Sequence, residues 1–384
     1  MPAFLLLALW SAAFLAPLSG DRPTPDPDPL LPDREYHVWV ASEATDRVHL
    51  VRWGPEGAEL VRTVSVSLLP TEADGPHGLA VSPDGEHLFV TTAHGRPYGH
   101  IAKYEAATGR RLGRAMLGHF PASLEVTPDG EYAFVVNFNL HGDMVPSSVS
   151  VVGLREMVEV ARLETCTMPH GSRISPDGRR HYSTCMMDDM LVEVDAWGLE
   201  VARHFLLTEG EEHGGRGRPG HAHHGAHQGH DGHEGMGHTQ RSLCSPTWAQ
   251  PSHDGTSVFV ACNASNEVVE VDVASWSLSR RLPAGEGVYN LAVTGDGRLL
   301  VATNKLGRSV SVFDLTSGEE AARIPTQRPV VHGVVISPDD RYAFISVEGI
   351  GSEPGTLEIL DLERMEMAAR VDVGQMAAGV VFWR

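Results

Sequence analysis

Three histidines, each followed by a glycine, recur far apart in the chain at His77, His170 and His332. In three other copies of the same repeat, the equivalent positions are Ala122, Thr247 and Tyr289. Neutral imidazole binds both zinc and copper, and three imidazoles leave a coordination position open for a further ligand. The pattern therefore predicts a metal site at these histidines, with copper preferred over zinc. Two alternatives remain, in which the rings donate to neighbouring carbonyls or act in acid–base catalysis. The sequence assigns no catalytic residue.

The chain contains four cysteines in two pairs, Cys166 with Cys185 and Cys244 with Cys262. The members of each pair stand almost symmetrically about one hairpin turn, which places the two sulfurs opposite each other and within or near disulfide distance. A disulfide in each pair is one expectation. The second is thiolate ligation of a metal, and nearby Met168, Met186 and Met187 would then favour Cu(I). Free or differently paired thiols are the third.

A histidine- and glycine-rich insertion occupies residues 208–241, between two repeats. Its metal-ligand candidates are His221, His223, His224, His227, His230 and His233. Almost no side chain in it can be buried, so we expect a disordered loop. Flexible histidine tracts bind Zn²⁺ or Cu²⁺ with modest affinity. The insertion is therefore interpreted as a metal-collecting loop, and the alternative is a solvated segment without a selected ligand.

The elements that position these residues are indicated by turns centred on aspartate. The turns occur at Asp84, Asp129, Asp177, Asp254, Asp296 and Asp339, spaced by 45, 48, 77, 42 and 43 residues. A period in the forties is typical of a four-stranded propeller blade, and the spacing of 77 contains the insertion. Runs of β-type residues flank each turn.

The sequence thus predicts an all-β fold, a seven-bladed β-propeller of four-stranded antiparallel blades. The seventh blade is split: residues 36–66 supply three of its strands, and the C-terminal strand 377–383 joins them and closes the ring. Residues just before the first strand and just after the second strand of a blade share one face, here called the top face. The aspartate turns lie on the opposite face, so we expect the three histidines to meet at the top of the central channel.

Several segments resemble known propeller families. L-F-V-T-T (88–92) and L-V-A-T-N-K (300–305) are similar to the Y-V-T-N repeat of secreted YVTN-type β-propellers, and the resemblance covers residues 36–384. H-G-S-R, from His170 to Arg173, resembles the segment that supplies an axial ligand in the propeller of haem-dependent nitrite reductases. That resemblance implies a haem-type tetrapyrrole held at His170 and Arg173. No C-x-x-C-H motif is present for covalent haem. P-H-G…S-P-D-G (76–85) resembles the propeller lactonases and implies a lactonase-like hydrolase.

The N-terminus and the charge indicate an exported protein. Residues 1–20 resemble a secretory signal peptide, with an uncleaved anchor as the alternative, and residues 21–34 form a Pro/Asp-rich linker before the propeller at 35–384. We expect a periplasmic or secreted protein without a membrane span after cleavage. The net charge of −20 argues against nucleic acid as a partner. A metal-free scaffold with a protein partner on the top face is a further alternative to the metal-binding function.

Overall fold

Each aspartate turn reverses the chain between the two inner strands of a blade. In the turn at Asp177, the carboxylate accepts hydrogen bonds from the Ser175 hydroxyl at 2.5 Å and from the Arg179 amide at 3.1 Å. Gly178 follows with a φ of 71°, a left-handed conformation that is accessible to glycine without steric cost. The other aspartate turns repeat the hydroxyl–carboxylate bond. These turns therefore set equivalent hairpins in six of the seven blades.

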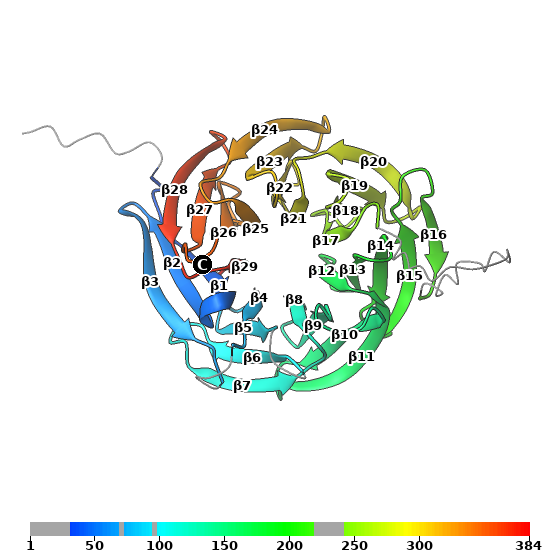
Figure 1. Cartoon of the computed structure of the whole chain (residues 1–384), viewed down its shortest axis with the longest axis horizontal. Helices are drawn as coiled ribbons and strands as arrows, with labels where there is room; N and C mark the ends of the chain where they lie inside the picture. Colours follow the sequence, from blue (N-terminus) through cyan, green and yellow to red (C-terminus); the bar gives the residue numbers. More distant parts are fainter. Residues whose placement is uncertain (1–30, 69–72, 94–97, 219–241) are drawn as a thin grey trace, which may run out of the picture.

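The computed structural model describes residues 31–68, 73–93, 98–218 and 242–384, and it arranges them as a ring of seven antiparallel β-sheets (Figure 1). The innermost strands line the axis, each beside the next one around the ring. In ring order they are β29 (Ala377–Phe382), β4 (Pro76–Val81), β8 (Pro121–Val126), β12 (Pro169–Ile174), β17 (Pro246–Pro251), β21 (Val288–Val293) and β25 (Val330–Ile336). We number the blades 1 to 7 in this order.

The second and third strands of the blades are largely buried. The second strands are β1 (Tyr36–Ser42), β5 (His87–Thr92), β9 (Tyr132–Asn137), β13 (Arg180–Cys185), β18 (Ser257–Cys262), β22 (Leu299–Asn304) and β26 (Tyr342–Glu348). The third strands are β2 (Arg47–Gly54), β6 (His100–Glu105), β10 (Pro146–Gly153), β14 (Met190–Asp195), β19 (Glu267–Asp272), β23 (Ser309–Asp314) and β27 (Thr356–Asp361). Their apolar side chains pack between neighbouring blades, as Tyr36 of blade 1 does against Tyr342 and Phe344 of blade 7.

The outer strands largely alternate half-buried and exposed residues, because one of their faces meets solvent. They are β3 (Gly57–Ser65), β7 (Arg111–Met116), β11 (Val158–Thr167), β15 (Glu200–Leu206), β20 (Ser277–Pro283), β24 (Glu319–Pro325) and β28 (Glu366–Asp372). A short 3₁₀ helix, η1 (Glu43–Thr45), connects β1 to β2 on the top face.

The C-terminal strand closes the ring. β29 pairs antiparallel with β1, with Val38 opposite Phe382 and Val40 opposite Val380. This confirms the closure predicted from the sequence, in which blade 1 combines both ends of the propeller. The predicted fold class, seven antiparallel blades with four strands each, is also confirmed, except that blade 4 gains a fifth strand.

The fifth strand comes from the beginning of the histidine-rich insertion. β16 (His213–Arg216) pairs with β15, with His213 opposite Leu206. Part of the segment expected to be disordered therefore extends the sheet of blade 4. The histidines proposed as metal collectors, His221 to His233, lie outside the described residues, as do the predicted signal peptide and linker residues 21–30. Among the helices of the described residues, none is long and apolar enough to cross a membrane.

Candidate metal centre at the channel mouth

The three predicted histidines meet at the axis of the ring. His77 on β4, His170 on β12 and His332 on β25 come from blades 2, 4 and 7. The ring centroids of His77 and His332 are 5.5 Å apart, and those of His77 and His170 are 6.2 Å apart. The convergence expected from the repeat positions is therefore present at the top of the channel.

The glycine after each histidine explains why the rings can approach so closely. A Cβ atom on Gly78 would lie 2.2 Å from the carbonyl oxygen of Ala122 in the next blade. A Cβ atom on Gly171 would lie 2.2 Å from the carbonyl oxygen of Thr247. Any side chain there would push adjacent inner strands apart. Glycine thus keeps the channel narrow enough for side chains of separate blades to share one site.

A carboxylate that the sequence analysis did not select completes the cluster. Glu43 extends from η1 of blade 1, which lies between blades 7 and 2, and its Oε1 contacts Nδ1 of His77. One ligand atom each from Glu43, His77 and His332 lie within 4.8 Å of one another. Metal–nitrogen and metal–oxygen bonds of about 2.0–2.2 Å place two ligands of one ion no more than about 4.4 Å apart. Small side-chain rotations would therefore close this set around an ion.

His332 has the burial and the protonation state that a metal ligand needs. Its side chain is 92% buried, yet Nδ1 has no hydrogen-bond partner among the described residues. Burial holds the pKa of His332 well below its usual value, and the nearby Lys305 ammonium lowers it further. The ring is therefore neutral near pH 7 and keeps a nitrogen lone pair, which is the form that binds metals.

His170 is bound differently. Its Nδ1 lies 2.8 Å from the carbonyl oxygen of Thr247, and its Nε2 lies 3.0 Å from the Tyr289 hydroxyl. A carbonyl only accepts, so Nδ1 carries the proton and Nε2 accepts from tyrosine. Burial lowers the pKa of His170 to about 3, so the ring is neutral. Because both nitrogens are engaged, the predicted set of three histidines becomes two histidines and a glutamate, with His170 beside them.

A polar wall from blades 6 and 7 borders the cluster. Nζ of Lys305 lies 4.2 Å from the ring centroid of Tyr289 and 3.7 Å from Oε1 of Glu348. The same Glu348 oxygen lies 4.0 Å from Nε2 of His332. Burial opposes the charged form of Lys305, but the negative potential of Tyr289 and Glu348 outweighs it and raises the lysine pKa. Burial raises the pKa of Glu348, and Lys305 partly offsets this.

A regular position in the repeat identifies this second set of residues. Lys305 and Glu348 each stand nine residues after a turn aspartate, Asp296 and Asp339 respectively. Glu43 occupies the equivalent place, directly after the second strand of blade 1, but that blade has no aspartate turn from which to count. The repeat position could therefore have identified Lys305 and Glu348 from the sequence, but not Glu43.

The proposed tetrapyrrole does not fit this geometry. His170 and Arg173 line a cavity of about 40 Å³ beneath the histidines. Sites for molecules of cofactor size occupy about 300–1,000 Å³. Arg173 is also engaged, since its guanidinium pairs with Glu125 at 3.2 Å and stacks over Trp248 at 4.4 Å. Neither residue is arranged to receive a macrocycle.

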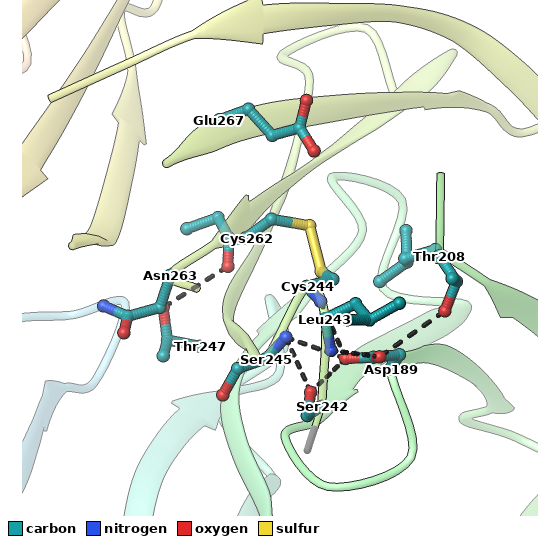
Figure 2. Close-up of a disulfide and its surroundings, with 12 residues drawn as sticks. Asp189, Thr208, Ser242, Leu243, Cys244, Ser245, Thr247, Cys262, Asn263 and Glu267 are labelled. Atoms are coloured by element: carbon teal, nitrogen blue, oxygen red, sulfur yellow. Dashed lines mark hydrogen bonds between the residues drawn. A yellow bond between two sulfur atoms is a disulfide. The ribbon is translucent and has the colours of Figure 1, made fainter. Parts of the chain in front are cut away.

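The four cysteines form the two expected disulfides, so the oxidised chain offers no thiolate to a metal. This corrects the alternative in which Cys166, Cys185, Cys244 and Cys262 bind copper. Cys166 lies in β11, the outer strand of blade 3, so its bond to Cys185 joins two blades. The bond between Cys244 and Cys262 stays within blade 5 (Figure 2).

The carboxylate of Asp189 fixes both ends of the histidine-rich insertion next to this second disulfide. It accepts hydrogen bonds from the backbone amides of Leu243 at 2.8 Å, Cys244 at 3.1 Å and Ser245 at 2.7 Å. Thr208, at the other end of the insertion, donates to the same carboxylate at 3.4 Å. Figure 2 shows these bonds converging on one side chain. The two ends of the insertion are therefore held next to each other on the top face.

No family model matches the chain, and no curated protein matches it. Among solved structures, hydrazine synthase of Kuenenia stuttgartiensis aligns with a TM-score of 0.62 and 20% identity over 82% of this chain and 91% of its own. A putative 6-phosphogluconolactonase of Bacteroides uniformis aligns with a TM-score of 0.65 and 15% identity over 91% of this chain and 99% of its own. A putative 6-phosphogluconolactonase of Bacteroides fragilis aligns with a TM-score of 0.65 and 15% identity over 93% of this chain and 99% of its own.

These likenesses define the class of protein: the chain is a seven-bladed β-propeller. Lactonase-like propellers are among its structural neighbours, in agreement with the resemblance of residues 76–85. At 20% identity or less, the neighbours establish the fold and not the activity.

Proposed function

We propose that this propeller binds a divalent transition-metal ion at the top of its channel through Glu43, His77 and His332. The observation that carries the proposal is the convergence of three donor atoms within 4.8 Å, one of them on a buried histidine with a nitrogen that no described residue hydrogen-bonds. Three protein ligands leave at least one position for an exogenous ligand, as in catalytic zinc sites. The donor set is two nitrogens and one oxygen, which suits Cu²⁺ and Zn²⁺. Copper is preferred because it forms the more stable complexes with such ligands.

The histidine-rich insertion would collect the same metal. Its anchored base lies on the top face, where the cluster also opens. Two disulfides are compatible with an oxidising compartment, and we propose that the protein works in the periplasm or outside the cell. Copper uptake by flexible imidazoles would weaken as the pH falls below about 6.5, because protons compete for the same nitrogens.

Metal content tests the proposal. The wild type and a His77→Gln/His332→Gln variant are saturated with Cu²⁺ or Zn²⁺ and dialysed against a weak chelator, which removes loosely held ions. Elemental analysis should then find one more equivalent per chain in the wild type. A His119→Gln/His253→Gln variant, altered at exposed histidines outside the insertion, is the matched control. Equal metal content in the wild type and the channel variant would contradict the proposal.

A lactonase-like hydrolase is the second candidate. It is favoured by the open coordination position next to Lys305 and Glu348, because a metal ion there could polarise a carbonyl or acidify a bound water. Turnover of a lactone panel that disappears in the His77→Gln/His332→Gln variant would support it. If the panel shows no metal-dependent turnover, the protein is a metal binder or a scaffold for a protein partner on the top face.

A further inference from the structure

A partly buried lysine borders the proposed metal centre, in a chain that almost never uses lysine. Of the 30 basic residues, Lys103 and Lys305 are the two lysines, and the other 28 are arginines. An ammonium is a compact charge with three rotatable donors, whereas a guanidinium is a planar fork. The lysine at position 305 therefore supplies a compact ammonium, whose donors can turn toward different partners, where an arginine would supply a rigid planar group.

The contacts of Lys305 leave donors for a ligand. At 3.7 Å, its approach to Oε1 of Glu348 is an ion pair rather than a hydrogen bond. Its other close neighbour is Tyr289, whose ring attracts the charge and whose hydroxyl can accept from one of the three N–H groups of the ammonium. The lysine side chain is 27% exposed, so part of it contacts solvent.

The distances allow one ligand to contact both the ion and the lysine. The shared Glu348 oxygen places Nζ of Lys305 within about 8 Å of Nε2 of His332. An ion bound by His332 would lie about 2 Å from the ring. A carboxylate with one oxygen on the ion and the other accepting from the ammonium can bridge about 7 Å. The two halves of the mouth are therefore within the reach of a single carboxylate.

The charges favour an anion once the metal is present. Without an ion, Glu43 and Glu348 contribute two negative charges against the positive charge of Lys305. A divalent ion changes this balance from −1 to +1 in a partly buried place. Uncompensated charge at such a site is costly, and an anion that also coordinates the ion removes it.

We propose that the metal-loaded channel mouth binds a small organic carboxylate, with one oxygen on the ion and the other on Lys305. This assignment names the ligand class of the site and rests on the proposed metal-binding function. Glu348 and the Tyr289 ring hold the ammonium in place. A neutral amide of the same size cannot replace the carboxylate, because it carries no charge to balance the ion.

Chemical modification of lysine tests the assignment in the full-length protein, because the chain has two lysines. The zinc-loaded protein is reductively methylated with increasing acetate or acetamide, and both lysines are followed by mass spectrometry. Acetate should slow the modification of Lys305 at least about tenfold and in a saturable manner, because the bound carboxylate occupies its donors. Lys103, on β6 of blade 2, is the internal control and should react equally throughout. Acetamide should have no effect.

Calorimetry with variants provides the second measurement. In Lys305→Met, acetate affinity should fall about ten- to hundredfold, while zinc content stays at the wild-type value. Lys103→Met should keep both. If the wild type holds no channel zinc, the proposed function itself fails. The carboxylate assignment is overturned if zinc is bound but acetate does not protect Lys305 from methylation. It is also overturned if the wild type and Lys305→Met bind acetate with the same affinity. Protection that persists in the metal-free His77→Gln/His332→Gln variant also overturns it.

Discussion

A buried histidine away from the channel should make the fold sensitive to acid. His181 on β13 is fully buried, its ring stacks on Phe134 at 5.0 Å, and neither ring nitrogen has a hydrogen-bond partner among the described residues. Burial lowers the pKa of His181 to about 3 from an ordinary value of 6.5. Between these values the unfolded chain binds a proton that the folded chain excludes, so stability falls as the pH decreases. From pH 6.5 to 4.5 the loss is about 2 kcal/mol, since each pH unit well below 6.5 counts for about 1.36 kcal/mol.

His181→Leu should remove this loss. Leucine has a similar volume and no polar atoms to leave unpaired, so the variant should be close to the wild type in stability at pH 7. The free energy of unfolding is measured by guanidinium titration and tryptophan fluorescence at pH 7 and 4.5, under conditions in which refolding is reversible. His49 and His170 are buried in both proteins, so they lower the free energy of unfolding at acid pH equally in the wild type and the variant.

The difference between the two proteins should therefore grow by about 2–3 kcal/mol on going from pH 7 to pH 4.5. His253→Leu, at an exposed position in the turn of blade 5, serves as the matched control and should run parallel to the wild type. Parallel curves for wild type and His181→Leu would refute the reasoning, because they would mean that His181 takes up a proton in the folded state as readily as in the unfolded chain.

Four further outcomes are expected. Glu43→Gln should weaken metal binding at least about tenfold in a competition titration with a chelator, because the site loses its only charged ligand candidate while its shape is kept. Asp189→Ala should speed proteolysis within residues 208–243 and cost at least about 2 kcal/mol, because three backbone amides lose a charged acceptor; Asp189→Asn should restore part of this. Gly171→Ala should lower the melting temperature and the metal content together, since its Cβ would collide with a backbone carbonyl. Removing the Cys244–Cys262 bond by Cys→Ser changes should cost about 3 kcal/mol, as expected for a separation of 18 residues, without changing the channel metal content.

The fold could be predicted from the sequence because its signals are local and repeated. Each aspartate turn determines its own hairpin, and the six turns together with the split blade determine the blade number. The closing pair of β29 with β1 followed from the same count, since blade 1 lacked an inner strand. β16 could not be predicted, because a glycine-rich tetrapeptide has no strand pattern of its own and pairs through its backbone with β15.

The candidate site was predicted in part. Counting back from each turn located His77, His170 and His332, because the propeller places equivalent residues at equal depth around the axis. The count could not show that Tyr289 and a carbonyl would engage His170, since these contacts depend on which blades are neighbours. Glu43 was missed because blade 1 has no turn to count from. The disulfide pairing was anticipated, but the position of Cys166 in blade 3 depends on where β11 ends.

The docking of β29 against β1 and β4 has a consequence for the order of events during folding. Gly379 lies so close to the carbonyl oxygen of His77 that a Cβ there would be 2.1 Å away, so the last strand forms part of the wall behind this ligand. Glu43 and His332 are nearly three hundred residues apart in the sequence, and the strand that brings their blades together, β29, follows both of them in the chain. A chain in which β29 has not yet docked therefore lacks the assembled cluster, so the proposed metal site would form only when the ring closes.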